Sequence, residues 1–352
     1  MLNQVFMRNM AAISLGFIML LASSKASLGA GQTEKVIIGT VAAVSDAGIY
    51  IGIAKGFFKE QGLELEPGIF DSGSNQVALL AAGKLDVAGG SPAAGLFNAF
   101  AQGVNIRIVA DKGTHTPGHG YIAFLVRKEL SSQVKKVEDL KKLERPRMSI
   151  NATGGSGQEP QLRTLLKMAG MDIKNVEVKI VPYPQVPAAL ASNGLDVAPT
   201  IEPYATKVIE QGIGTKLVWI DDFRPNDIGG VLMYSEQFMK ERPQAAKNFM
   251  VAYLKSVRYY LDAFEGKNPA LKSEVINILA QNTTVKEPDL YQRMRVPGFD
   301  AGGRVNVPSL KNLFSDFVAI GYIQNPEKVK VESLVDNSFV DYAVQKLGPY
   351  KR

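Results

Sequence analysis

Residues that could bind an anion gather in one short glycine-rich segment. In residues 153–158, Gly154, Gly155 and Gly157 would let the backbone approach a ligand closely, and Ser156 and Gln158 add side-chain donors. The segment lies between an expected strand and an expected helix, whose free N–H groups and positive dipole end favour an anion. It lacks the Gly-Lys-Ser/Thr ending of a phosphate-binding P-loop. We therefore predict contact with a small anionic ligand, with an ordinary strand-to-helix turn as the alternative.

Further candidates lie where other strands are expected to end. Ser45 and Asp46 begin the first expected helix, and Ser91 follows a later strand. Glu202 and Tyr204 occupy the corresponding place in the second half of the chain. Because loops at the carboxyl ends of parallel strands face the crevice of an open α/β sheet, we predict that all five contact the ligand. Helix capping is the alternative for Ser45 and Asp46, and a hinge role is the alternative for Glu202.

The two histidines of the chain favour a binding role over a metal or catalytic one. His115 and His119 lie in residues 113–120, which are too rich in Gly and Pro to place them on one helical face. No third metal ligand and no set of nucleophile and base can be named beside them. We expect Thr114 and His115 to donate hydrogen bonds at the rim of a cleft, and we expect no metal and no cofactor. Four aromatic residues are candidate apolar walls, with core packing as the alternative for the tryptophan: Tyr121, Tyr183, Phe223 and Trp219.

A degenerate internal repeat predicts two lobes that would position these residues. Residues 78–88 read ALLAAGKLDVA, and residues 188–198 read AALASNGLDVA. Each copy is typical of a helix, a Gly or Asn stop, and a short strand. Two such units 110 residues apart predict two α/β lobes with a cleft between them, where small ligands usually bind.

The other elements alternate between strand and helix until about residue 220, which indicates mainly parallel sheets. Residues 122–126 and 229–234 are expected to cross between the lobes, and the later chain is expected to be mostly helical. Strands are expected over 36–41, 63–66, 85–88, 106–110, 147–150, 176–181, 195–198 and 216–220. Late helices are expected over 309–320 and 331–346.

The N-terminus predicts export of the chain. Arg8 precedes an apolar stretch, residues 10–22, and a small-residue segment follows, which is the layout of a secretory signal peptide. Cleavage is expected after Ala26 or Ala30, and an uncleaved membrane anchor is the alternative. Loss of Arg8 and Lys25 lowers the formal charge from +6 to +4, with the positive residues scattered. This pattern argues against a nucleic-acid partner, and the absence of cysteine excludes a thiolate nucleophile.

The order of several short motifs resembles a known family of binding proteins. The motifs are residues 56–63 (GFFKEQGL), 82–87 (AGKLDV), 90–92 (GSP), 101–110 (AQGVNIRIVA), the Gly-Ser loop before 165–170 (LLKMAG), 195–197 (LDV) and 202–204 (EPY). In this order they resemble the substrate-binding proteins of bacterial ABC importers for nitrate, sulfonates, taurine and thiamine pyrimidines. The resemblance covers most of the chain after the signal peptide.

The resemblance implies a type II periplasmic-binding-protein fold, with two α/β lobes, a two-strand hinge and a helical C-terminal part. The expected division is residues 1–30 for the signal peptide, 33–122 and 228–346 for the first lobe, and 123–227 for the second. The implied role is a monomeric periplasmic receptor without catalytic activity. It would close around a small organic, anionic solute, a sulfonate or carboxylate, and deliver it to an ABC permease in the inner membrane. Binding or synthesis of a thiamine-pyrimidine precursor is the alternative.

Overall fold

Five strands form the sheet of the first lobe. The protein is described by a computed structural model that covers residues 33–152, 155–266 and 268–351, so the predicted signal peptide lies outside the described residues. The strands are β1 (Glu34–Thr40), β2 (Leu63–Ile69), β3 (Val87–Gly90), β4 (Arg107–Asp111) and β12 (Val231–Tyr234). Their order across the sheet is β2-β1-β3-β12-β4. β1 is parallel to β2 and β3, and β12 is antiparallel to β3 and β4.

The sheet of the second lobe repeats this plan. Its strands are β6 (Ile122–Arg127), β7 (Arg147–Ile150), β8 (Glu177–Ile180), β9 (Val197–Ile201) and β10 (Gly214–Trp219). The order is β8-β7-β9-β6-β10, with β7 parallel to β8 and β9, and β6 antiparallel to β9 and β10. In both sheets one antiparallel strand therefore lies between the third parallel strand and the outer strand.

A short pair of strands marks the two passages of the chain between the sheets. β5 (Thr114–His115) and β11 (Asp227–Ile228) pair antiparallel, with His115 opposite Asp227. Both segments that we expected to cross, residues 122–126 and 229–234, were placed a few residues late. They fall largely in the antiparallel strands β6 and β12, and the passages precede them. The two-lobe α/β fold with its hinge is confirmed, whereas the lobe boundaries at 122/123 and 227/228 stay predictions.

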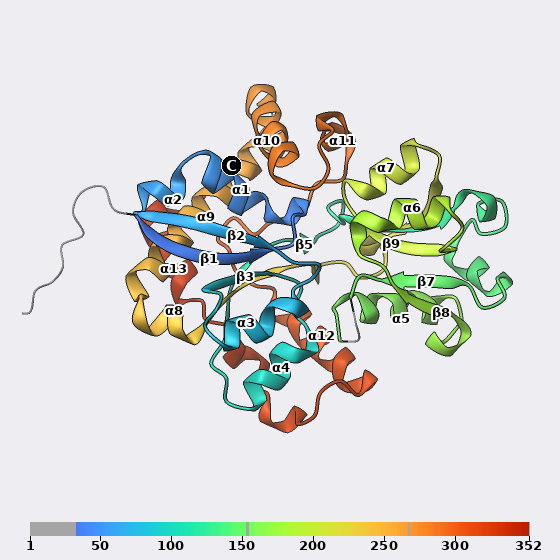
Figure 1. Ribbon diagram of the computed structural model, residues 1–352, viewed down its shortest axis with the longest axis horizontal. Helices are drawn as coiled ribbons and strands as arrows, with labels where there is room; N and C mark the ends of the chain where they lie inside the picture. The colour runs from blue at the N-terminus through green and yellow to red at the C-terminus, as the bar shows by residue number, and fades with distance from the viewer. Residues whose placement is uncertain (1–32, 153–154, 267, 352) are drawn as a thin grey trace, which may run out of the picture. The chain divides into compact units, whose positions relative to one another are not determined.

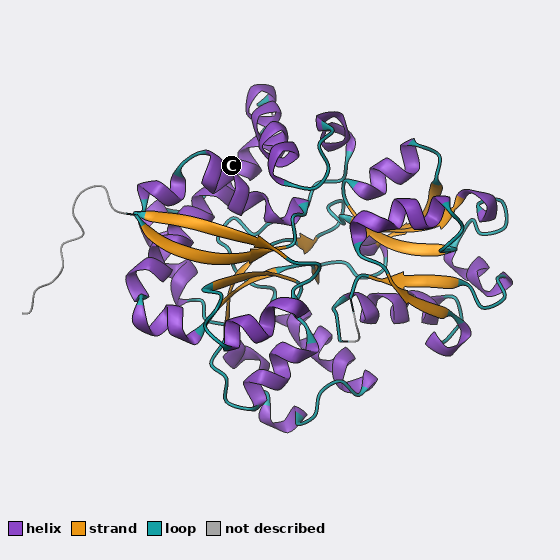
Figure 2. Cartoon of the chain, in the orientation of Figure 1, coloured by secondary structure: helices purple, strands orange, loops and turns teal. Residues whose placement is uncertain are grey.

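Helices cover both faces of each sheet (Figures 1 and 2). In the first lobe these are α1 (Ala47–Ala54), α2 (Phe57–Glu60), α3 (Val77–Ala81), α4 (Ala94–Ala101), α8 (Glu236–Glu241), α9 (Pro243–Phe264), α10 (Pro269–Asn282), α11 (Pro288–Arg293), α12 (Val307–Ile320) and α13 (Ser338–Leu347). In the second lobe these are α5 (Gln158–Met168), α6 (Val186–Ala191) and α7 (Tyr204–Glu210). The helical C-terminal part is thus confirmed, although the last helix begins at Ser338 rather than near 331. No helix in the described part of the chain is long and apolar enough to cross a membrane.

The internal repeat has the same structural role in both lobes. Gly83 and Asn193 end the helices α3 and α6 with φ of 66° and 58°, the left-handed conformation that Gly and Asn adopt at low cost. The next aspartate in each copy accepts a hydrogen bond from a backbone N–H of the first parallel strand of its sheet, β1 or β7. Asp86 accepts from Ile37 at 2.8 Å, and Asp196 accepts from Arg147 at 2.8 Å. The strands β3 and β9 begin one residue after these aspartates. The repeat therefore fixes β3 against β1 in the first sheet and β9 against β7 in the second.

Candidate functional site

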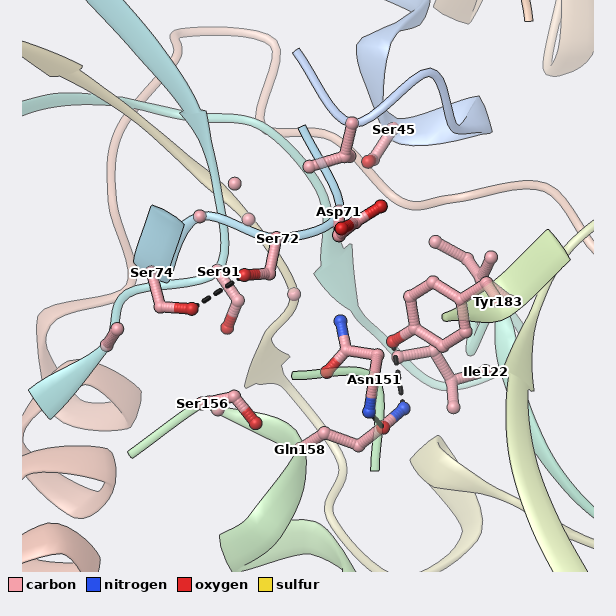
Figure 3. A pocket seen from close by; sticks show the side chains of 18 of the residues that line it. Ser45, Asp71, Ser72, Ser74, Ser91, Ile122, Asn151, Ser156, Gln158 and Tyr183 are labelled. Atoms are coloured by element: carbon pink, nitrogen blue, oxygen red, sulfur yellow. Dashed lines mark hydrogen bonds between the residues drawn. The ribbon is translucent and has the colours of Figure 1, made fainter. Parts of the chain in front are cut away.

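A small cavity lies where loops of both lobes meet at the carboxyl ends of the parallel strands. Its volume is about 50 Å³, and Figure 3 shows first-lobe side chains facing those of the second lobe across it. The first lobe contributes Val41, Ser45, Asp71, Ser72, Ser74 and Ser91 among others. The second lobe contributes Asn151, Ser156, Gln158, Gln161, Tyr183 and Ile201. This is the crevice position in which open α/β sheets bind ligands.

The structure brings five of the twelve predicted site residues to this cavity. They are Ser45, Ser91, Ser156, Gly157 and Gln158. Gly154 lies outside the described residues. The remaining six do not line the cavity: Asp46, Thr114, His115, Gly155, Glu202 and Tyr204. Of the four predicted aromatic walls, Tyr121 and Tyr183 line it, whereas Phe223 packs on Phe124 and Trp219 lies under the guanidinium of Arg295.

Asp46 organises the loop that carries Ser45. One carboxylate oxygen, Oδ2, accepts the N–H groups of Val41 and Ala43, each at 3.1 Å. The other, Oδ1, lies 2.8 Å from the ammonium of Lys112, and both side chains are fully buried. Both carboxylate oxygens of Asp46 therefore face groups within the protein, which gives Asp46 a structural role.

Lys112 is the residue that sequence reasoning missed at this wall. Its Nζ donates a hydrogen bond of 3.1 Å to Ser45 Oγ, so a buried ammonium lies directly behind a hydroxyl that lines the cavity. Gly89 makes room for it, because a Cβ at that position would lie 2.8 Å from Lys112 Cε. The sequence did contain a signal that could have marked Lys112. Two charged residues, Asp111 and Lys112, directly follow the apolar residues of an expected strand, where site residues are expected.

Ser156 and Gln158 stand at the start of α5 without capping it. The helix begins after Gly157 with no side-chain cap, and Ser156 Oγ is buried without a hydrogen-bond partner. Gln158 Oε1 accepts the N–H of Asn151 at 2.5 Å, and its Nε2 donates to the Tyr183 hydroxyl at 2.9 Å. Burial raises the pKa of Tyr183, so this hydroxyl is neutral. These groups place donors at the second-lobe wall of the cavity.

The loops of the two lobes touch beside the cavity. The N–H of Ala94 donates to the carbonyl of Gly155 at 2.9 Å. A Cβ at position 157 would lie 2.3 Å from Ser91 Oγ, so Gly157 permits the close approach of the two loops. The carboxylate of Glu159 also accepts a hydrogen bond of 2.8 Å from the Tyr322 hydroxyl. Gly155 therefore contacts the opposite lobe rather than the cavity.

Glu202 and Tyr204 connect the second lobe to the C-terminal helices. The buried Glu202 carboxylate accepts the N–H and hydroxyl of Thr206 and the N–H of Arg295, each at 3.0 Å. Burial raises the pKa of Glu202 to about 6. Tyr204 and Thr284 share a hydrogen bond between their hydroxyls. The alternative that we weighed for Glu202, a hinge role, fits these contacts better than contact with a ligand.

Thr114 and His115 belong to the hinge. Thr114 Oγ1 donates to Asp111 Oδ1 at 2.8 Å. His115 is fully buried with its ring 4.3 Å from that of Tyr121, and burial lowers its pKa to about 4. His115 is therefore neutral near pH 7 and supports a residue of the cavity from behind. In the ranges that the structure describes, no three His, Cys, Asp or Glu side chains are grouped so that they could hold a metal ion.

Five polar residues that line the cavity were not predicted as site residues: Asp71, Ser72, Ser74, Asn151 and Gln161. Gln161 Nε2 donates to Asp227 at 3.4 Å, which leaves Gln161 Oε1 buried without a partner. Asp71 alone carries a formal charge among the described residues that line the cavity. The loop of residues 71–75 follows the second strand of its lobe, and that position was the signal that could have marked it.

The comparison with protein families identifies the chain. A model of the NMT1-like family matches residues 29–280. The chain belongs to the NMT1-like family. This confirms the resemblance that the order of motifs indicated, and no curated protein sequence matches the chain.

Solved structures agree with this assignment at the level of the fold. The nitrate-binding protein NrtA from Synechocystis PCC 6803 is similar with a TM-score of 0.71 at 16% identity, over 90% of this chain and 89% of that one. The alkanesulfonate-binding protein SsuA from Xanthomonas axonopodis pv. citri, bound to MOPS, has a TM-score of 0.68 at 17% identity, over 88% and 100%. The ligand-binding component of an ABC-type import system from Staphylococcus aureus has a TM-score of 0.71 at 16% identity, over 88% and 99%. The desulfurization enzyme DSZB has a similar fold too, with a TM-score of 0.59 at 14% identity, over 89% and 99%.

Proposed function

We propose that this NMT1-like protein is a periplasmic solute receptor that captures a small anionic organic solute, such as a sulfonate or carboxylate, between its lobes. It then delivers the solute to an ABC permease in the inner membrane and acts as a monomer. The observation that carries the proposal is the cavity built by strand-end loops of both lobes. A ligand there contacts both lobes at once, and such contact favours the closed arrangement by hinge motion.

The size of the cavity limits what the protein can hold in this arrangement of its lobes. About 50 Å³ gives room for about four groups the size of water, since one such group needs about 10–15 Å³. The polar head of a small solute, such as a sulfonate or a carboxylate, fits this space. A longer apolar part would need a wider separation of the loops that carry Asp71 and Tyr183.

Neutral donors would hold the anion. No lysine or arginine is found among the described residues that line the cavity. Five serine hydroxyls are found there instead, on Ser45, Ser72, Ser74, Ser91 and Ser156. The unpartnered hydroxyl of Ser156 stands at the start of an eleven-residue helix, where the dipole adds about 0.3–1 kcal/mol for an anion. A hydrogen bond to a charged group contributes about 1.5–3 kcal/mol, so a few of these donors suffice for tight binding.

We propose further that the protein catalyses no reaction. A hydroxyl nucleophile needs an adjacent base, and the described lining contains no histidine. Ser45 is hydrogen-bonded to a lysine that is itself paired with Asp46, so this lysine is occupied in an ion pair. Turnover of a bound sulfonate, measured as release of sulfite, would overturn this part of the proposal.

A second candidate is a receptor for an aminopyrimidine. The charge of Asp71 and the fixed acceptor Gln161 Oε1 both suit a ligand that carries N–H donors, and Tyr183 offers an aromatic face. The same cavity would then select against anions. One binding experiment distinguishes the two candidates.

Thermal unfolding in the presence of matched solutes tests the proposal. Methanesulfonate, nitrate and benzoate represent the anions, dimethyl sulfone is the uncharged control for methanesulfonate, and 4-aminopyrimidine represents the second candidate. A ligand at 100 times its Kd stabilises the native state by about 2.7 kcal/mol, which raises Tm measurably. We expect at least one anion to raise Tm while dimethyl sulfone does not, and small-angle scattering to show compaction with that anion. A shift with 4-aminopyrimidine alone would replace the first candidate by the second.

Export is proposed from the sequence of residues 1–30. The intact mass of protein isolated from the cell envelope is expected to show an N-terminus between Ser27 and Gly31. A chain that retains Met1 and fractionates with membranes would contradict export with cleavage.

A further inference from the structure

The buried ion pair of Lys112 and Asp46 lies directly behind Ser45, a residue that lines the cavity. Both side chains are fully buried, and burying two charges costs several kcal/mol of solvation per ion. The loop around Asp46 already has its N–H groups bound to Asp46 Oδ2. Lys112 adds a contact to a residue of the cavity, through its hydrogen bond to Ser45 Oγ. The position of this ammonium therefore affects the binding wall.

A serine hydroxyl has one proton and can accept as well as donate. Lys112 can only donate, so Ser45 Oγ is the acceptor in their hydrogen bond. The single proton of Ser45 is then available to another group. The cavity is one destination, because Ser45 lines it, and the neighbouring Tyr121 hydroxyl is the other. Tyr121 has its own long hydrogen bond of 3.5 Å to the carbonyl of Gly113.

We propose that Lys112 is a positioning residue that orients the Ser45 hydroxyl as a donor into the cavity, so that the bound solute must place an acceptor oxygen there. This inference rests on the proposed function and deepens it by assigning the polarity of one contact. The ammonium donates to the Ser45 hydroxyl and is paired with Asp46 Oδ1, while Asp46 Oδ2 accepts the N–H groups of Val41 and Ala43. A solute N–H group, which can only donate, would meet the Ser45 proton and be disfavoured. A sulfonate or carboxylate oxygen would accept it.

The role of Lys112 can be separated from loop anchoring by a double-mutant cycle. The variant Lys112→Met with Asp46→Asn removes both charges together and leaves no buried charge unpaired. Ser45→Ala removes the hydroxyl, and the triple variant combines the changes. The double variant leaves the net charge unchanged. The exposed Lys84 gives a control for the change from lysine to methionine itself, Lys84→Met, at a position outside the cavity. The probe is methanesulfonate, titrated by calorimetry, with Tm recorded for every variant.

The positioning role predicts effects on affinity that are not additive. Loss of one hydrogen bond to a charged ligand is expected to weaken binding about 10- to 150-fold, so Ser45→Ala and the double variant each lose affinity in this range. The triple variant should lose little more than either, because Lys112 acts through Ser45. Lys84→Met should bind as the wild type does. If the fold-loss of affinity in the triple variant equals the product of the losses in Ser45→Ala and in the double variant, the pair acts independently of Ser45 and the proposal is overturned. Full affinity in the double variant would overturn it as well and would assign the pair to loop anchoring.

Neutron diffraction on deuterated crystals tests the same point without any ligand. We expect a deuteron from Lys112 Nζ to point at Ser45 Oγ and the Ser45 deuteron to point into the cavity. A Ser45 deuteron directed away from the cavity, at Tyr121 above all, overturns the proposal. If methanesulfonate gives no heat while the deuterons lie as expected, the proposed solute class fails and the orientation by Lys112 stands.

Discussion

The two walls of the cavity orient a hydroxyl in the same way but with different chemistry. In the first lobe the Ser45 hydroxyl accepts from a buried ammonium, Lys112, which needs Asp46 as its counter-charge. In the second lobe the Tyr183 hydroxyl accepts from the neutral amide of Gln158, which is held by the N–H of Asn151. Each hydroxyl retains one proton to donate. The comparison shows that a directed donor can be built with or without a buried charge, and that the charged version carries a much larger risk to stability.

The largest expected difference between the walls is in the free energy of unfolding. Lys112→Met leaves Asp46 buried without its partner, and breaking a buried pair in this way costs about 3–5 kcal/mol. Gln158→Leu removes neutral hydrogen bonds, each with a net contribution of about 0.5–1.5 kcal/mol. Urea unfolding of both variants measures the difference. Adding Asp46→Asn to Lys112→Met should recover much of the loss, and equal losses in the two single variants would contradict the comparison.

The next effect concerns pH, because the first-lobe wall is supported by a buried histidine. Burial lowers the pKa of His115 to about 4, against 6.5 for an ordinary histidine. The unfolded chain therefore binds a proton below about pH 6.5 that the folded protein takes up only near pH 4. Above about pH 6.5, His115 does not lower the free energy of unfolding. As the pH falls from 6.5 toward 4, this group lowers the free energy of unfolding by about 3 kcal/mol in total.

His115→Phe isolates this contribution, since it keeps a ring against Tyr121 and removes the titration. Burial raises the pKa of Asp111 and Glu202 to about 6, so protonation of these carboxyls raises the free energy of unfolding as the pH falls. This contribution is the same in the wild type and in His115→Phe, and it cancels in their difference. The difference in unfolding free energy between wild type and variant, measured from pH 7.5 to pH 4, should therefore move in favour of the variant as the pH falls. Parallel curves would show that His115 keeps its ordinary pKa.

The smallest of these effects is on affinity at the second-lobe wall. Ser156→Ala removes an unpartnered hydroxyl and should weaken binding of the anion identified by thermal unfolding about 10- to 150-fold. Its Tm without ligand should barely change, because Ser156 does not cap α5. We expect a smaller loss than for Ser45→Ala, since nothing described orients the Ser156 hydroxyl. A fall in ligand-free Tm with unchanged affinity would give Ser156 a structural role instead.

The elements that were predictable from sequence depend on local patterns. Apolar runs and the repeated Leu-Asp-Val-Ala segment indicated two α/β lobes, because each pattern reports its own strand or helix. The Gly-Ser loop before α5 could be predicted for the same reason, since its position between strand and helix is local. The crossing segments were placed a few residues late because an antiparallel strand within a lobe and a strand between lobes have the same apolar composition.

The residues that the sequence did not reveal depend on contacts between distant segments. Lys112 acts on Ser45, 67 positions away, and only the folded sheet brings them together. Glu202 matched the expected position after its strand, but its carboxylate turns toward Thr206 and Arg295. Position along the chain predicted three of the loops that meet at the cavity, those that carry Ser45, Ser91 and Ser156, and missed the loop of residues 71–75. It did not predict which side chain of each loop points inward.

The antiparallel strand β12 has a consequence for the order in which the chain can assemble. The sheet of the second lobe uses residues 122–219 without interruption, whereas the first sheet needs β12, residues 231–234, between β3 and β4. During translation or translocation, the second lobe can therefore complete its strand pairing before the first lobe can. Until residue 234 is available, β3 keeps one open edge and β4 has no strand partner, and such open edges are sites for pairing with other chains. A chain of this topology therefore leaves strand edges of its first sheet unpaired until β12 follows the second lobe.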